Sequence, residues 1–99
     1  MNKDIMTYQF ITALKSLPFV DAIWLFGSRA RGDNQERSDI DLAILCPSAT
    51  QDDWSRILDI IESSDTLLKI DCIRLEKNRI SNELYQNILK DKVIIYAKK

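Results

Sequence analysis

Four short runs of apolar and β-branched residues alternate along this chain with segments of helical periodicity. The runs predict strands over residues 20–26, 39–46, 67–75 and 93–96. Apolar residues three or four positions apart predict helices over residues 3–17, 50–63 and 80–89. Such alternation predicts an α/β fold in which helices flank a sheet. Because only a short polar loop joins the first two strands, they can pair antiparallel, which makes the expected sheet mixed and twisted.

Two local signals refine this outline. Thr50 and Asp53 have the spacing of a capping pair at the start of a helix. The polar segment 27–38 reads as a loop that can contain a helical turn beginning at Ser28. The expected order of elements is therefore α-β-β-α-β-α-β, in a single domain over residues 1–99.

The composition excludes several classes of function. With 14 Lys and Arg against 15 Asp and Glu, the net charge is −1, so we expect no direct binding of nucleic acid. No apolar stretch approaches the roughly 20 residues that span a bilayer, so we expect a cytoplasmic protein without a membrane contact. The absence of His removes Ser-His-Asp and Cys-His catalysis, and with them the usual zinc sites. Cys46 and Cys72 lie in apolar runs, which is typical of structural thiols. Carboxylates remain as the chemical groups to consider.

Asp39 and Asp41 open the second predicted strand. Side chains alternate along a strand, so both carboxylates point to the same side. Two such neighbours repel each other, and each is costly to bury unless a cation neutralises it. Hard oxygen ligands without histidine favour Mg²⁺, which takes one or two protein carboxylates and completes its shell with water and phosphate oxygens.

Asp71 is a third candidate, because it interrupts the otherwise apolar third strand. If that strand lies beside the second, Asp71 can join Asp39 and Asp41 in a site for two metal ions. The alternative is a surface ion pair of Asp71 with Lys69 or Arg74. The spacing alone does not separate the two interpretations.

Gly27 and Ser28 follow the first strand. Glycine lets the backbone approach a ligand closely, and the serine adds a hydroxyl donor, so the pair can hold phosphate oxygens. Arg29 or Arg31 can assist a triphosphate, although acidic neighbours compete for both. By itself, the Gly-Ser dipeptide is equally typical of a solvated turn.

Taken together, Gly27-Ser28, ten intervening residues and Asp39-Ile40-Asp41 match the signature GSx10DxD. The chain thereby resembles the polymerase-beta-like nucleotidyltransferases. The fuller text GSRARGDNQERSDIDLAIL is similar to their minimal nucleotidyltransferase (MNT) branch, and the likeness extends over nearly the whole chain.

The resemblance implies a mixed, twisted sheet flanked by helices, with Asp39, Asp41 and Asp71 as catalytic acidic residues and Mg²⁺ ligands. It also implies that Gly27 and Ser28 bind the nucleoside triphosphate, and we add Arg29 as a nucleotide contact. Members of the superfamily transfer a nucleotidyl group from a nucleoside triphosphate such as ATP to a hydroxyl and release pyrophosphate.

In the HEPN/MNT toxin–antitoxin systems, the MNT antitoxin transfers AMP to a tyrosine of a HEPN ribonuclease. The resemblance therefore predicts a HEPN-type partner that supplies the acceptor. One alternative is a binding antitoxin that masks its partner without chemistry. Another is nucleotidyl transfer to a small molecule such as an aminoglycoside, or to an RNA end. Monomer and oligomer both remain open for the chain itself.

Overall fold

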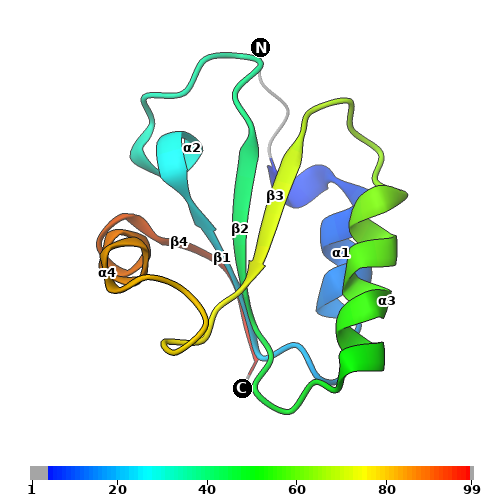
Figure 1. The fold of residues 1–99 in the computed structure, drawn as a ribbon. Helices are drawn as coiled ribbons and strands as arrows, with labels where there is room; N and C mark the ends of the chain where they lie inside the picture. Colours follow the sequence, from blue (N-terminus) through cyan, green and yellow to red (C-terminus); the bar gives the residue numbers. More distant parts are fainter. Residues whose placement is uncertain (1–4, 99) are drawn as a thin grey trace.

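A four-stranded sheet forms the centre of the fold. The computed structural model describes residues 5–98 (Figure 1). The strands are β1 (Ala22–Phe26), β2 (Ile40–Leu45), β3 (Ile70–Arg74) and β4 (Val93–Ala97). Their order across the sheet is β3-β2-β1-β4, with β2 parallel to β3 and β1 antiparallel to both β2 and β4. The prediction of a mixed sheet in an α/β fold is confirmed.

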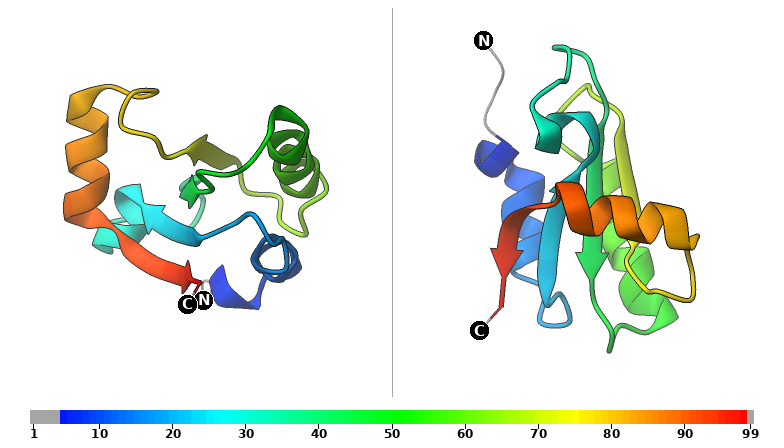
Figure 2. Two further views of the ribbon diagram at one scale, coloured as in Figure 1. Left: turned by 90° about the horizontal axis from the view of Figure 1, so that it is seen from below. Right: turned by 90° about the vertical axis from the view of Figure 1, so that its left-hand side faces the viewer.

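Helices lie on both faces of this sheet (Figure 2). They are the short 3-10 helix η1 (Ile5–Thr7), α1 (Gln9–Lys15), α2 (Gly27–Arg31), α3 (Gln51–Glu62) and α4 (Asn82–Asp91). We call the side covered by α1 and α3 the α1/α3 face, and the opposite side the α2/α4 face. Within residues 5–98, no helix has the length and apolar character that crossing a bilayer requires.

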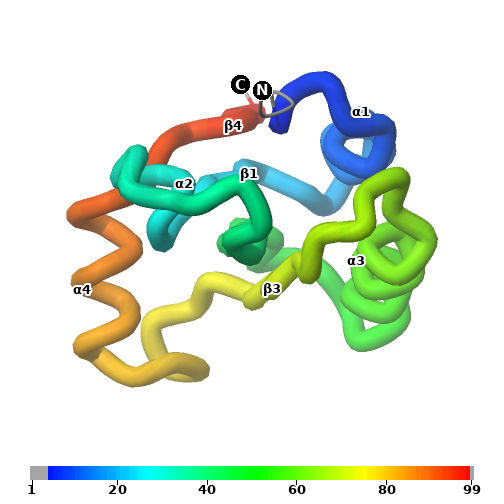
Figure 3. Tube along the Cα trace, turned by 90° about the horizontal axis from the view of Figure 1, so that it is seen from above, coloured from blue at the N-terminus to red at the C-terminus, as the bar shows by residue number. Residues whose placement is uncertain are grey.

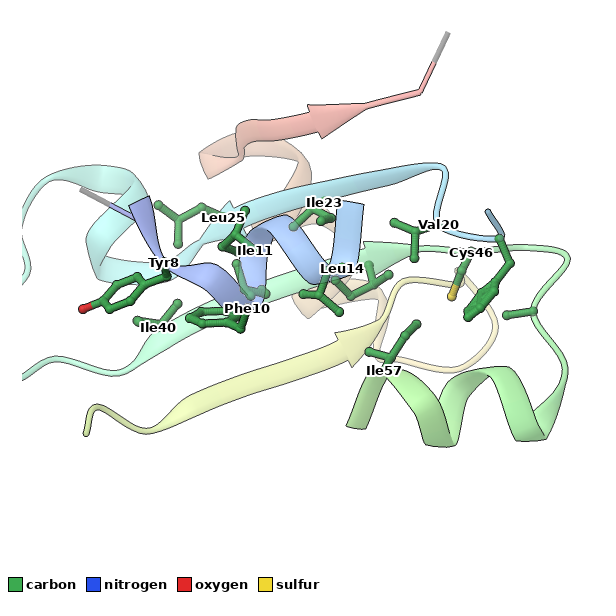
Figure 4. Close-up of a cluster of buried hydrophobic side chains, with 14 residues drawn as sticks. Tyr8, Phe10, Ile11, Leu14, Val20, Ile23, Leu25, Ile40, Cys46 and Ile57 are labelled. Carbon is green, nitrogen blue, oxygen red and sulfur yellow. The ribbon is translucent and has the colours of Figure 1, made fainter. Parts of the chain in front are cut away.

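Buried apolar side chains join the sheet to α1 and α3 (Figure 4). In the two central strands they occupy every second position: Ile23, Leu25, Ile40, Leu42 and Ile44. Burying such a side chain stabilises a fold by roughly 1.5–3 kcal/mol relative to leaving it exposed. Because strand residues alternate between faces, the same pattern assigns Asp39 and Asp41 to the α2/α4 face.

Helix boundaries follow from capping contacts. The capping pair predicted for α3 is confirmed: the Thr50 N–H donates to Oδ2 of Asp53 at 2.9 Å, and the Asp53 N–H donates to Oγ1 of Thr50 at 3.1 Å. The helix predicted over residues 3–17 is shorter, because the Gln9 N–H donates to the carboxylate of Asp65 at 3.1 Å and α1 begins there. Part of that prediction, at residues 3 and 4, lies outside the described residues.

Other predicted boundaries shift by a few residues. The strand predicted over 67–75 begins only at Ile70, where its pairing with Ile40 of β2 begins. The last helix begins and ends two residues later than predicted, because the Ser81 hydroxyl accepts from the Leu84 N–H at 3.2 Å and caps it. The helical turn predicted from Ser28 is α2, which begins one residue earlier.

Both cysteines are free thiols. Burial raises the pKa of Cys72 to about 12 and raises the pKa of Cys46 as well. A thiol whose pKa is raised by burial is rarely deprotonated at neutral pH, so it is a poor nucleophile and a poor metal ligand. Cys46 belongs to the buried apolar cluster and Cys72 packs against it, which agrees with the prediction of structural thiols.

Candidate active site

Three neighbouring strands bring Gly27, Asp41 and Asp71 into one row. Phe26, the last residue of β1, lies opposite Asp41 of β2, and Asp41 lies opposite Asp71 of β3. Gly27 directly follows Phe26. The row crosses the end of the sheet where β1 ends and the parallel strands β2 and β3 begin (Figures 1 and 3). The side-by-side placement of the second and third strands, on which a site including Asp71 depended, is confirmed.

Gly27 lies directly against the carboxylate of Asp41. A Cβ built on Gly27 would overlap Oδ2 of Asp41 and lie 3.1 Å from its Cγ. The φ angle of Gly27 is +74°, a backbone conformation that L side chains rarely adopt. Glycine is therefore required here by both the backbone conformation and the close approach. The close approach seen here is to Asp41, and the predicted approach of the Gly27 backbone to a ligand stays a prediction.

Asp41 has an electrostatically unfavourable position. Its pKa is raised first by burial, then by the charge of Asp71 and a hydrogen bond to it, and further by the charge of Asp39. The charge of Arg31 acts in the opposite direction. Two neighbouring carboxylates disfavour each other's charged form, and a bound cation would relieve that repulsion.

Asp71 lies beside Asp41 and pairs with Lys69, but it does not pair with Arg74. It interacts with Asp41, and its Oδ1 lies 3.6 Å from Nζ of Lys69. Arg74 points elsewhere: its Nη2 donates to the carbonyl oxygens of Cys46 and Ala49 at 3.2 and 2.9 Å. The proposed ion pair with Arg74 is therefore wrong, because that side chain holds the loop after β2. The predicted ion pair with Lys69 forms, and Asp71 still lies beside Asp41.

Asp39 is the third acidic residue of the predicted site, and it lies outside the row of paired strand residues. It lies just before β2, and its charge reaches Asp41 strongly enough to raise the pKa of that residue. Among residues 5–98, no three acidic or cysteine side chains converge into a ready-made metal-binding cluster. The chemistry of the donors nevertheless fits Mg²⁺, which needs only one or two protein carboxylates when a substrate phosphate supplies further oxygens. A role of all three aspartates as metal ligands stays a prediction.

Ser28 and Arg29 occupy the first turn of α2. Within residues 5–98, the Ser28 hydroxyl makes no hydrogen bond, so it is available to a ligand. Arg29 is engaged: its Nε and Nη2 donate to the carbonyl oxygen of Ser38 at 3.1 and 2.8 Å, and Nη2 donates to that of Glu36 at 3.0 Å. In this geometry Arg29 holds the loop before β2 against α2. Nucleotide contacts of Gly27, Ser28 and Arg29 stay predictions.

Arg31 connects α2 to the end of α4. Its Nε lies 3.0 Å from Oδ2 of Asp33, and its Nη1 lies 3.3 Å from Oδ2 of Asp91. Sequence reasoning named Arg31 but missed Asp91, which lies 60 positions further along the chain. No short-range spacing signals a contact of that kind. Arg31 is the cation whose charge lowers the pKa of Asp41, so this ion pair places positive charge near the row of carboxylates.

Two solved structures share this fold. A chain from a toxin–antitoxin structure with AMP-PNP superposes with a TM-score of 0.65 and 23% identity, covering 92% of this chain and 73% of that one. A chain from the complex of a tri-AMPylated Shewanella oneidensis HEPN toxin with its MNT antitoxin gives a TM-score of 0.59 and 20% identity, covering 91% of this chain and 69% of that one.

Comparisons of the sequence with known proteins identify the family of this chain. A Methanocaldococcus jannaschii protein assigned as a protein adenylyltransferase is 31% identical over 81 residues, which cover 82% of this chain and 81% of that protein. Residues 9–99 match the family described as Polymerase beta, Nucleotidyltransferase. The match extends over the row of Gly27, Asp41 and Asp71 and confirms the resemblance seen in the sequence. The chain belongs to the polymerase beta nucleotidyltransferase family and is a nucleotidyltransferase.

Proposed function

We propose that the chain is a Mg²⁺-dependent adenylyltransferase that transfers AMP from ATP to a hydroxyl, most simply a tyrosine, of a HEPN-type toxin, and so acts as its antitoxin. The observation that carries this proposal is the contact of Asp41 with Gly27, with Asp71 opposite Asp41 on the next strand, in a chain of this family. The relative assigned as a protein adenylyltransferase and the fold shared with MNT antitoxins support it.

In this proposal the nucleotide binds on the β1 side of Asp41 and the acceptor hydroxyl binds on the β3 side. Gly27 and Ser28, directly after β1, bind the triphosphate, because the Ser28 hydroxyl makes no hydrogen bond within residues 5–98 and Gly27 brings the backbone close to Asp41. Asp39 and Asp41 hold Mg²⁺, which, when bound, neutralises charge on the phosphates and lowers the repulsion that raises the pKa of Asp41.

Asp71 faces the acceptor side, because β3 is the edge strand of the sheet. We assign it the proton of the acceptor hydroxyl, which its carboxylate takes as the hydroxyl oxygen bonds to the α-phosphorus. The bond from that phosphorus to the bridging oxygen breaks, and pyrophosphate leaves with the electron pair. The contribution of the protein is then mostly orientation of the two substrates and stabilisation of charge.

The test incubates the chain with the HEPN-type protein encoded beside it, Mg²⁺ and ATP labelled at the α-phosphate. We expect label on a tyrosine of that protein and loss of its ribonuclease activity. Asp39→Asn/Asp41→Asn is expected to abolish both effects. The matched control, Asp59→Asn/Glu62→Gln, removes two exposed carboxylates from α3 and is expected to retain them.

Three other outcomes would contradict the proposal. If the double variant at Asp39 and Asp41 still neutralises the partner and no label is transferred, the chain is a binding antitoxin that masks its partner. If label appears on an aminoglycoside or an RNA end and not on protein, the acceptor class is wrong. If chelation of divalent cations leaves the transfer unchanged, the dependence on Mg²⁺ is wrong.

A further inference from the structure

A hollow lies beside the carboxylates at the outer edge of the sheet. Its cavity volume is about 390 Å³, and its lining consists of Arg37, Leu67, Leu68 and Lys69. Arg37 belongs to the loop between α2 and β2, and the other three belong to the loop between α3 and β3. Both loops lie at the end of the sheet where β2 and β3 begin (Figure 3).

The hollow is connected to the active site through its own residues. Lys69 lies 3.6 Å from Asp71, and its carbonyl oxygen accepts from the Ile40 N–H at 2.9 Å. Arg37 precedes Asp39 by two residues. The hollow is lined by the loops that enter β2 and β3, whereas Gly27 follows β1. A molecule bound in the hollow would therefore approach the row of Gly27, Asp41 and Asp71 from the β2–β3 side, next to Lys69 and its partner Asp71.

The lining combines positive charge with exposed apolar surface. Leu67 is fully exposed, and within residues 5–98 the exposed Arg37 makes no ion pair or side-chain hydrogen bond. Lys69 is 71% exposed at its side chain and has two further N–H donors beyond its pair with Asp71. A fully exposed leucine that shares the hollow with two cations fits a partner segment that carries both an apolar side chain and carboxylates.

We infer that this hollow docks an acidic segment of the protein that carries the acceptor hydroxyl, with an apolar side chain of that segment against Leu67. The inference rests on the proposed function and specifies how its acceptor is recognised. Docking at the β3 edge presents the hydroxyl to Asp71, while the triphosphate lies against Gly27. The carboxylates of the segment pair with Arg37 and Lys69, which also keeps them away from the three aspartates.

The test compares two doubly substituted chains with the same chemical changes. Arg37→Glu/Leu67→Ser alters the hollow, and Arg56→Glu/Leu58→Ser alters an exposed arginine and an exposed leucine of α3. Transfer of labelled AMP to the HEPN-type partner is measured over a range of partner and ATP concentrations. For the hollow variant we expect the KM for the partner to rise at least about tenfold, with kcat and the KM for ATP changed less than about twofold. The α3 variant is expected to leave all three constants within about twofold of wild type.

Salt and a charge swap give a second readout. The KM of the wild type for the partner is expected to rise with ionic strength, because exposed charge pairs are screened, and the hollow variant is expected to lose that dependence. Replacing the carboxylates next to the modified hydroxyl of the partner by Lys is expected to weaken transfer by the wild type and to restore transfer by Arg37→Glu.

The other possible outcomes each contradict the inference, and each points to a different role for the hollow. An equal loss in both variants, or an unchanged KM for the partner in the hollow variant, overturns the inference and leaves the proposed function standing. A rise in the KM for ATP alone would make the hollow part of the nucleotide site. A change of oligomeric state would make it a contact between two copies of the chain. If the wild-type chain transfers no label to the partner, the proposed function itself fails, and the inference fails with it.

Discussion

The two faces of the sheet are built from alternate residues of the same strands, yet opposite forces dominate them. On the α1/α3 face, Leu42 and Ile44 are fully buried among apolar side chains. On the α2/α4 face, Asp41 is half-buried beside Asp71 and has a raised pKa. Apolar packing on the α1/α3 face therefore offsets the destabilising repulsion between Asp41 and Asp71 on the α2/α4 face. Substitutions at neighbouring positions can test this division.

The largest effect is expected from Asp41→Asn. Loss of this carboxylate should lower kcat/KM for AMP transfer at least about 1000-fold, or about 4 kcal/mol of transition-state stabilisation, because the proposed function assigns Asp41 to the binding of Mg²⁺. In the absence of divalent cations the same variant should unfold at a higher temperature than wild type at pH 7, since the repulsion with Asp71 is gone. Asp59→Asn on α3 is the control for activity.

The pH dependence of that stability gain has a definite sign. Because the pKa of Asp41 is raised in the folded state above its ordinary value of 3.8, the folded state holds the proton more tightly than the unfolded state. The stability of the wild type should therefore fall as pH rises through the interval from 3.8 to the raised pKa. The advantage of Asp41→Asn should vanish below that interval. An equal advantage at low pH, measured by thermal melts without metal, would show that repulsion is not its cause.

Leu42→Ala tests the other face one position away. We expect a loss of about 3 kcal/mol in the free energy of unfolding, because the removed side chain leaves a cavity in the packed cluster. Leu45, in the same strand but on the α2/α4 face, is half-buried, and Leu45→Ala should cost about 1 kcal/mol. Urea unfolding checks both values. Similar losses in the two variants would mean that the faces share the stability evenly.

Gly27→Ala and Gly32→Ala separate backbone strain from the contact with Asp41. Both glycines have positive φ, +74° and +84°, but a Cβ at Gly32 would meet nothing within 4 Å. Gly32→Ala should therefore cost about 1 kcal/mol of stability and leave transfer nearly unchanged. Gly27→Ala should cost about 2 kcal/mol and lower kcat/KM about 100-fold, because its Cβ displaces the Asp41 carboxylate. Equal kinetics in the two variants would show that the close approach has no function.

Sequence patterns predicted those features of the fold and the site that depend on local geometry. The two-residue period of β2 was enough to separate Asp41 from the buried Ile40 and Leu42, and the Thr50–Asp53 spacing was enough to place the start of α3. Contacts between distant residues were not predictable in this way. Asp65 caps α1 from 56 positions away, and only the folded chain brings it there.

The same limit applies to the arginines of α2. Sequence reasoning expected Arg29 at the triphosphate because a guanidinium suits phosphate, and that contact stays a prediction; the bonds from Arg29 to the carbonyl oxygens of Glu36 and Ser38 had no signal in the sequence. The neighbouring Arg31 meets Asp91, a residue for which the sequence holds no signal. The chemistry of a side chain indicates which groups it can bind, whereas tertiary packing determines which of those groups lie within hydrogen-bond distance.

Arg31→Gln is expected to have the smallest effect. It tests whether the charge of Arg31 lowers the pKa of Asp41 on the α2/α4 face. The ion pairs of Arg31 with Asp33 and Asp91 are exposed at the arginine, so the melting temperature should change by less than about 2 °C. Its positive charge lowers the pKa of Asp41, so its loss should move the titration of Asp41 to higher pH. Carbon NMR of the side-chain carboxyls in the metal-free protein measures that shift directly. Arg56→Gln on α3 removes the same charge far from the row and should leave the titration unchanged. If both variants shift Asp41 equally, net charge accounts for the effect. If only Arg31→Gln does, the charge of Arg31 lowers the pKa of Asp41 locally and favours its ionised form.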